Sequence, residues 1–121
     1  MDQESVAGIL GEMTAVTHRL AEERSLALHR EVARQLRERP ELLDAARERV
    51  RSWLESGCVS RHWAEAWNDV LEGTLDDVIA VITDSSQRPR DLRQSSPFAG
   101  VLDPRKRWEI LRRYRERTTS P

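Results

Sequence analysis

Histidine and cysteine are the side chains of this chain that could bind a metal ion or pair as nucleophile and base. The sequence has one cysteine and three histidines, Cys58, His18, His29 and His62. Cys58 and His62 could meet on one helix, but Gly57 and Ser60 predict a turn between them, and the second ligand pair that a structural zinc site needs is missing. We interpret the pair as structural or solvated and expect neither a metal nor a cofactor.

Two pairs of carboxylates could supply a general acid and a general base. Glu65 and Asp69 alternate with a tryptophan-bearing apolar face, so we expect them to point to solvent. Asp76 and Asp77 suit the positive end of a helix dipole, which explains them without catalysis. The sequence contains no glycine-rich phosphate loop, no serine-hydrolase elbow and no zinc-protease helix motif. We therefore expect a non-enzymatic protein without catalytic residues.

Large aromatic side chains can build a core or anchor a partner. We assign Trp53, Trp67 and Trp108 to the core by preference. Trp63 opens its helix beside Arg61, and we expect it to be partly exposed and available to a partner.

A basic cluster near the C-terminus is the strongest electrostatic feature. Its members are Arg105, Lys106, Arg107, Arg112, Arg113, Arg115 and Arg117. Residues 1–87 carry 10 basic and 17 acidic side chains, whereas residues 88–121 carry 10 and 4. Pairing with the acidic N-terminal segment is the interpretation that we favour. The other is binding of nucleic-acid phosphates through Arg105, Lys106, Arg107, Arg112 and Arg113, which the overall pI near 6.3 weakens.

The first third of the chain is predicted to be helical. Residues 3–39 contain no proline, and their apolar side chains recur every three or four residues. Pro40 ends this run. Whether it is one helix or two, with Ser25 capping the second, stays open. The segment 1–24 is an extension whose heptad-like stripe could serve oligomerisation.

Local stop and start signals divide the rest of the chain. Gly57 and Ser60 separate two helices, and Gly73 ends the second. Thr74 with Asp77 resembles a capping box, which favours a helix over a strand for the β-branched segment that follows.

The C-terminal third has a turn, an apolar loop and a last helix. Residues 84–90 are turn-like, and a brief helical turn follows around Leu92. The loop 95–102 is apolar enough to be ordered. Asp103 and Pro104 begin the last helix, which we expect to fray at 118–121.

These signals together predict an all-α fold. We expect a compact bundle of about five to seven helices with a long N-terminal helix or helix pair, forming a single domain over residues 1–121. The longest apolar runs are too short to cross a membrane, and the lone cysteine fits a reducing compartment, so we expect a cytoplasmic protein.

One segment suggests a family. The motif LRQSSPFAGVL at 92–102, followed by PRKRWEIL at 104–111, resembles a signature of small bacterial proteins. Their bodies also read like LHREVARQLRERPELL at 28–43, followed by a tryptophan-rich helix. The resemblance covers residues 26–117. It implies the antitoxin-like half of a two-gene toxin–antitoxin module, with a nucleotidyltransferase-like toxin among the partners, and it carries a role rather than catalytic residues.

The resemblance implies inhibition by occlusion, in which a helical domain covers the surface of a toxin. The predicted partner-binding residues are Arg93, Gln94, Ser95, Ser96, Pro97, Phe98, Arg105, Trp108 and Trp63. The alternative is that the loop 95–102 only seals the core between two helices. Both interpretations stay open.

Two other function classes remain. A DNA-binding helix-turn-helix could use the helices at 60–72 and 75–83, although the acidic start of the second would repel phosphate. A homo-oligomeric structural protein could assemble through the N-terminal stripe.

Overall fold

Six helices form the part of the chain that the computed structural model describes, namely the backbone of residues 3–98 and 100–119 and the side chains of residues 19–98 and 100–114. They are α1 (Gln3–Glu38), α2 (Leu42–Ser56), α3 (Arg61–Leu71), α4 (Leu75–Ile82), α5 (Gln87–Arg93) and α6 (Pro104–Thr119). These residues contain no strand. The prediction of an all-α bundle is confirmed.

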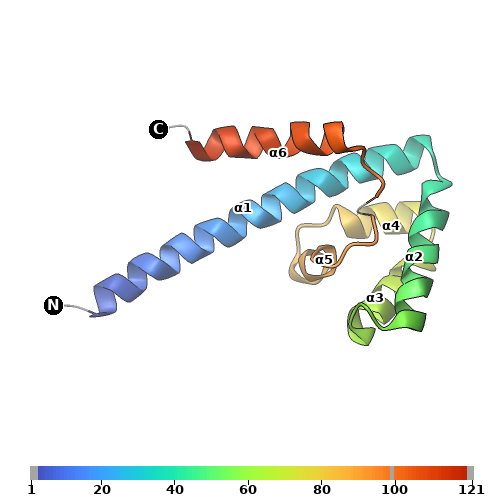
Figure 1. The fold of residues 1–121 in the computed structure, drawn as a ribbon, viewed down its shortest axis with the longest axis horizontal. Helices are drawn as coiled ribbons and strands as arrows, with labels where there is room; N and C mark the ends of the chain where they lie inside the picture. Colours follow the sequence, from blue (N-terminus) through green and yellow to red (C-terminus); the bar gives the residue numbers. More distant parts are fainter. Residues whose placement is uncertain (1–2, 99, 120–121) are drawn as a thin grey trace.

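The N-terminal segment is one continuous helix of 36 residues, which decides between the two alternatives. Ser25 lies inside α1 and begins no new helix. The helix ends at Glu38 because Pro40 disfavours a helical conformation in the residue before it. In Figure 1, α1 runs along the whole molecule; α2 to α5 gather around its C-terminal part, and its first turns extend past every other helix.

The helices α2 and α3 form an antiparallel pair joined by a tight turn. Gly57 ends α2 in the left-handed conformation, with φ of 72°, and donates its N–H to the carbonyl of Trp53 at 2.9 Å. The Ser60 side chain then caps α3 by accepting from the backbone N–H of Trp63. Both capping predictions are confirmed.

The helix α4 begins with a complete capping box. The Thr74 hydroxyl accepts from the N–H of Asp77, and the Asp77 carboxylate accepts from the N–H of Thr74. These two bonds give partners to backbone N–H groups at the start of α4, which have none within the helix. The β-branched segment is therefore helical, as predicted. The short helix α5 follows and buries Leu92.

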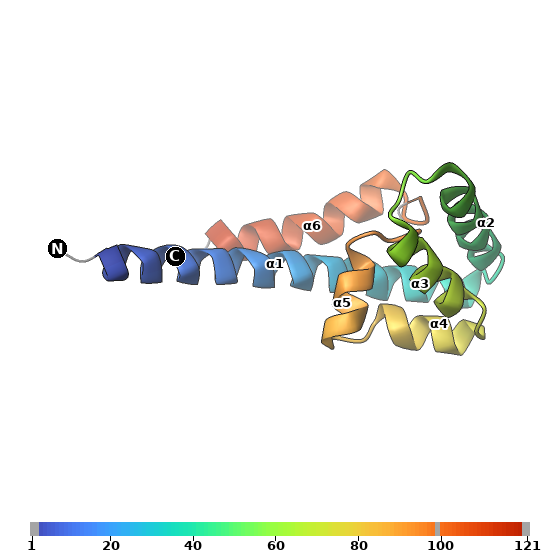
Figure 2. The same cartoon turned by 90° about the horizontal axis from the view of Figure 1, so that it is seen from below.

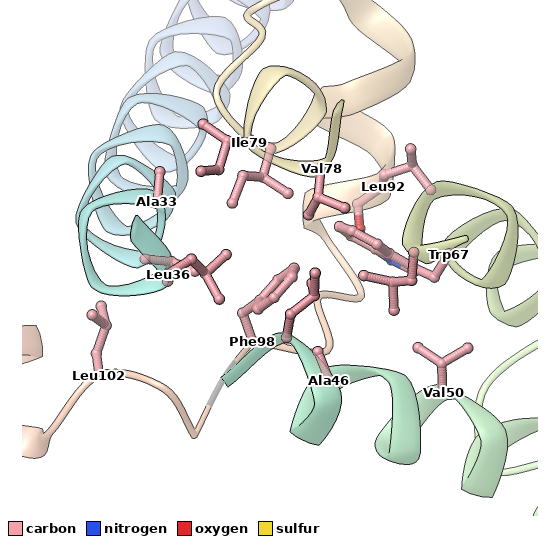
Figure 3. Close-up of a cluster of buried hydrophobic side chains, with 14 of the residues drawn as sticks. Ala33, Leu36, Ala46, Val50, Trp67, Val78, Ile79, Leu92, Phe98 and Leu102 are labelled. Atoms are coloured by element: carbon pink, nitrogen blue, oxygen red, sulfur yellow. The ribbon is translucent and has the colours of Figure 1, made fainter. Parts of the chain in front are cut away.

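The core lies where α2, α3, α4 and α5 meet the C-terminal half of α1 (Figure 3). Trp67 is completely buried, donates its indole N–H to the carbonyl of Leu92 at 3.0 Å, and meets Phe98 edge to face with ring centroids 6.0 Å apart. Trp67 is therefore a core residue, as predicted. Trp53 and Trp63 are partly buried and pack against the same cluster.

The last helix returns along α1 in the opposite direction, so that both ends of the chain lie on one side of the molecule (Figure 2). The Asp103 carboxylate accepts from the N–H groups of Arg105 and Lys106, which confirms the predicted start of α6. The helix continues through Thr119 and thus enters the segment that we expected to fray. The rest of that segment, 120–121, lies outside the described residues.

Candidate functional site

The loop that follows α5 supplies core side chains. Pro97, Phe98 and Leu102 are buried, and only 2% of Phe98 is exposed. In Figure 3 the Phe98 ring points between α1 and the α2 to α4 helices. The sequence left open whether this loop binds a partner or seals the core. Its buried apolar side chains seal the core. Pro97 and Phe98 therefore cannot touch a partner in this conformation, contrary to their assignment as binding residues.

Arg93 is also an internal residue. Only 5% of it is exposed, and its guanidinium donates to the carbonyls of Asp84 at 2.6 Å and of Ile82 at 3.4 Å. These bonds cap the C-terminal end of α4, where helix carbonyls lack intrahelical partners. Its Nε atom is buried and has no hydrogen-bond partner among the described residues. Burial, followed by the charge of Arg90, lowers the pKa of Arg93. Arg93 therefore joins α5 to α4 and does not present a surface anchor.

A serine and a histidine far apart in the sequence meet beneath the loop. His29 Nδ1 lies 2.7 Å from the carbonyl oxygen of Ser25, and Nε2 lies 2.7 Å from the hydroxyl of Ser96. Because a carbonyl can only accept, we infer that Nδ1 carries the proton and that Nε2 accepts from Ser96. The Ser96 oxygen in turn accepts from the N–H of Phe98 at 3.2 Å. The chain of bonds fixes the loop to α1.

The Ser96 hydroxyl and the His29 imidazole also have the layout of a nucleophile next to a general base. The pKa of His29 is lowered to about 4, chiefly by burial; the bond to Ser25 opposes this shift, and the nearby charge of Arg93 contributes to it. A base with so low a pKa takes up a proton poorly at neutral pH. We therefore interpret the pair as a structural link. Nothing in the sequence joins His29 to Ser96, which lie 67 positions apart.

A pocket of about 470 Å³ opens beside this pair, between α1, the loop and α6. We call it the α1–α6 pocket. Its lining residues are Ala21, Arg24, Ser25, Leu28, His29, Val32, Arg93, Gln94, Ser96, Phe98, Leu102, Arg107 and Leu111. Of the predicted binding residues, Gln94 is exposed at its rim, whereas Ser95 and Ser96 are partly buried.

The outward side of α6 carries an aromatic side chain between two arginines. Trp108 is 58% exposed, which corrects its assignment to the core. Arg105 and Arg112 are also exposed, one turn before and one turn after Trp108, and the Arg112 guanidinium lies 5.3 Å from the centre of the Trp108 ring. We call these three residues the outer stripe of α6.

The other side of α6 packs on α1 through different residues. Ile110 is buried there, and Tyr114 packs against the core cluster. Trp108 and Ile110 are two positions apart, which is roughly 200° around an α-helix, so both cannot face α1. The outer stripe therefore points away from the rest of the molecule.

Arg105, Lys106 and Arg107 of the basic cluster form no ion pair with the described acidic side chains of α1, but the charge of Lys106 acts on Glu31 of that helix; the side chains of Arg115 and Arg117 lie outside the described residues. Lys106 pairs within its own helix, with Glu109 at 4.0 Å. The pair that reaches α1 comes from Arg90, outside the cluster, which lies 3.3 Å from Glu22. Among residues 19–98 and 100–114, Arg105 and Arg107 form no ion pair.

The remaining candidates lie on α3 and its approach. Cys58 is exposed, 3.1 Å from the Ser56 hydroxyl, and Glu65 and Asp69 are exposed as predicted. Trp63 is partly buried and stacks edge to face with His62. Because α3 packs on α2, α4 and α5 while α6 packs chiefly on α1, Trp63 belongs to a different surface from Trp108. Within the described residues, no three metal-binding side chains gather into one site.

Comparisons of the chain with protein-family models, with curated proteins and with solved structures gave no match. None of the helices in the described part of the chain has the length and apolar character needed to span a lipid bilayer.

Proposed function

We propose that this chain is a partner-binding helical domain, the antitoxin-like member of a bacterial toxin–antitoxin pair, which neutralises its partner protein by covering part of that protein's surface. The resemblance of residues 92–111 to antitoxin-like proteins supports the class of partner. The observation that carries the proposal is the outer stripe of α6, where Trp108 is 58% exposed between two arginines.

The outer stripe has the composition of an interface centre. Tryptophan and arginine are the residue types that most often dominate binding energy, and truncation of such an anchor typically costs about 2 kcal/mol or more. Exposure of a tryptophan to water is unfavourable. Each Å² of its apolar surface that a partner buries would stabilise the complex by about 25 cal/mol. The two arginines favour an acidic surface on the partner.

The buried side chains of the loop region hold α6 in place. Arg93, His29 and Phe98 fix the end of α5 and the loop, from which α6 departs after Leu102. A rigid departure point holds α6 against α1 before binding, and an anchor that is already in place loses less entropy when the complex forms. Core sealing by the loop and binding by α6 are thus compatible roles.

The test is coexpression of the chain with the product of its adjacent gene. We expect the two proteins to copurify at high salt, and we expect the chain to relieve the toxicity of that product. Trp108→Ala should weaken the complex by about 30-fold, the equivalent of about 2 kcal/mol. The matched control is Leu54→Ala, because Leu54 is another exposed large apolar side chain, 40% exposed, on α2. It should bind like the unmodified chain.

Absence of both a complex and toxicity would refute the proposal. Equal weakening by Trp108→Ala and Leu54→Ala would also refute the assignment of the surface.

A nucleic-acid-binding regulator is the second candidate, because Arg105 and Arg107 form no ion pair among the described residues. It predicts that duplex DNA binds with an affinity that falls steeply as salt rises, with a slope set by the number of neutralised phosphates. The helix-turn-helix version is weaker, since Asp76 and Asp77 are exposed on the first turn of α4. A mass measurement of the isolated chain tests the homo-oligomer.

A further inference from the structure

The described side chains that line the α1–α6 pocket carry charge of one sign only. Arg24, Arg93 and Arg107 line it, and none of its described lining residues is an aspartate or glutamate. Its volume of about 470 Å³ falls in the range of pockets that bind small molecules. A concave site with cationic walls concentrates anions, because the low-dielectric protein around it focuses the field.

None of the three arginines forms an ion pair with a carboxylate among the described side chains, although Asp84 and Glu22 act on Arg93 from a distance. Arg24 and Arg107 are exposed and form no ion pair within residues 19–98 and 100–114. Arg93 is bonded to backbone carbonyls only, and its buried Nε has no partner among the same residues. Burial of the Arg93 guanidinium outweighs the attraction of the Asp84 and Glu22 carboxylates, and a bound anion would offset part of that cost.

The rest of the lining is polar at Ser25, His29, Gln94 and Ser96 and otherwise apolar. The apolar part includes Leu28, Val32, Phe98, Leu102 and Leu111, which come from α1, the loop and α6. A free inorganic ion would leave this part of the pocket without contacts. The lining therefore matches a ligand that has an anionic group and an apolar body.

We propose that the α1–α6 pocket binds a small organic anion, a carboxylate or phosphate ester with an apolar chain or ring. Arg24 of α1 and Arg107 of α6 hold the anionic group. The partly exposed Leu28 and Leu111 contact the body, and the buried Phe98 lies at the floor of the pocket. This site faces the inner side of α6, whereas the outer stripe faces away, so the proposal does not depend on the partner protein.

The probe for the test is octanoate, titrated into the full chain and followed by calorimetry and by nuclear magnetic resonance. We expect saturable binding, with chemical-shift changes at His29 and Phe98. Octylammonium, which has the same chain and the opposite charge, should bind at least tenfold more weakly. Inorganic phosphate should also bind at least tenfold more weakly, because it lacks the apolar body.

Variants locate the site. Arg24→Gln and Arg107→Gln should each weaken octanoate binding by about two- to fivefold, the range expected for exposed charges. The matched control is Arg37→Gln, an exposed arginine of α1 outside the lining, which should leave the affinity unchanged. Ala21→Phe changes no charge but narrows the pocket from an exposed position, and it should abolish binding.

Several results would overturn the proposal. They are octylammonium or inorganic phosphate binding as tightly as octanoate, unchanged affinity in both arginine variants, and shift changes that avoid His29 and Phe98. Each variant keeps its fold if its circular dichroism and its unfolding midpoint match those of the unmodified chain, so loss of binding can be separated from loss of structure.

Discussion

The buried histidine makes the stability of this protein depend on pH in a range where most side chains do not titrate. His29 is 7% exposed, and burial lowers its pKa from 6.5 to about 4. In the unfolded chain the same imidazole takes up a proton near pH 6.5. Between these two values the unfolded state binds more protons than the folded state, so stability is full above pH 6.5 and falls as the pH drops towards 4.

The size of this effect follows from the two pKa values. Between pH 7 and pH 5 the free energy of unfolding should fall by about 2 kcal/mol through His29 alone. The perturbation is His29→Gln, which removes the titrating group and keeps a side chain that can both donate and accept. Urea unfolding at pH 7 and at pH 5 measures the loss in each protein.

We expect His29→Gln to be less stable than the unmodified chain at pH 7, because the bonds to Ser25 and Ser96 are altered, but also less sensitive to pH. Its loss between pH 7 and pH 5 should be smaller by about 2 kcal/mol. His62→Gln, which changes an exposed histidine, is the matched control and should lose as much stability between pH 7 and pH 5 as the unmodified chain. Equal losses of stability in the His29→Gln variant and the unmodified chain would refute the reasoning. They would mean that burial does not lower the pKa of His29.

Three further expectations concern stability and can be checked by urea or thermal unfolding. Phe98→Ala should lower the free energy of unfolding by about 3–5 kcal/mol because it leaves a cavity in the core. Trp108→Ala should change it by no more than about 0.5 kcal/mol. Similar losses would contradict the finding that Phe98 is buried and Trp108 exposed. Thr74→Ala should cost about 1 kcal/mol by removing the cap of α4, and an unchanged midpoint would mean that the capping box contributes nothing. Gly57→Ala should cost about 1–2 kcal/mol, since no atom crowds the position and only its left-handed φ of 72° is strained by a side chain. A stabilised Gly57→Ala variant would contradict that conformation.

Local chemistry explains which parts of the fold could be predicted. The capping residues Ser60, Thr74 and Asp103 bond to backbone groups within three positions, so their short sequence neighbourhoods contain all that decides them. Gly57 and Pro40 act through their own dihedral angles. The continuity of α1 could not be predicted in this way, because Ser25 is compatible with both a cap and a helix interior.

Contacts between segments far apart in the sequence determine which of the predicted binding residues are exposed. Several of the predictions that these contacts control were wrong. The sequence favours a core position for Trp108 while also offering it as a binding residue, because apolar residues lie on more than one side of α6. The position of α1 selects the side with Ile110 and leaves Trp108 exposed. The partner-binding assignment of Arg93 and Phe98 came from a motif. The structure uses these residues to cap α4 and to fill the core, which sequence spacing could not indicate.

The order of the helices along the chain also affects how the protein folds during synthesis. The helix α1 is made first, yet the helices that pack on it include α4, α5 and α6, which are made last. Local helices such as the α2–α3 pair can form early, but contacts between distant segments must wait for loop closure. A nascent chain that has not yet released α6 therefore exposes apolar surface on α1, and such surface attracts chaperones or promotes aggregation.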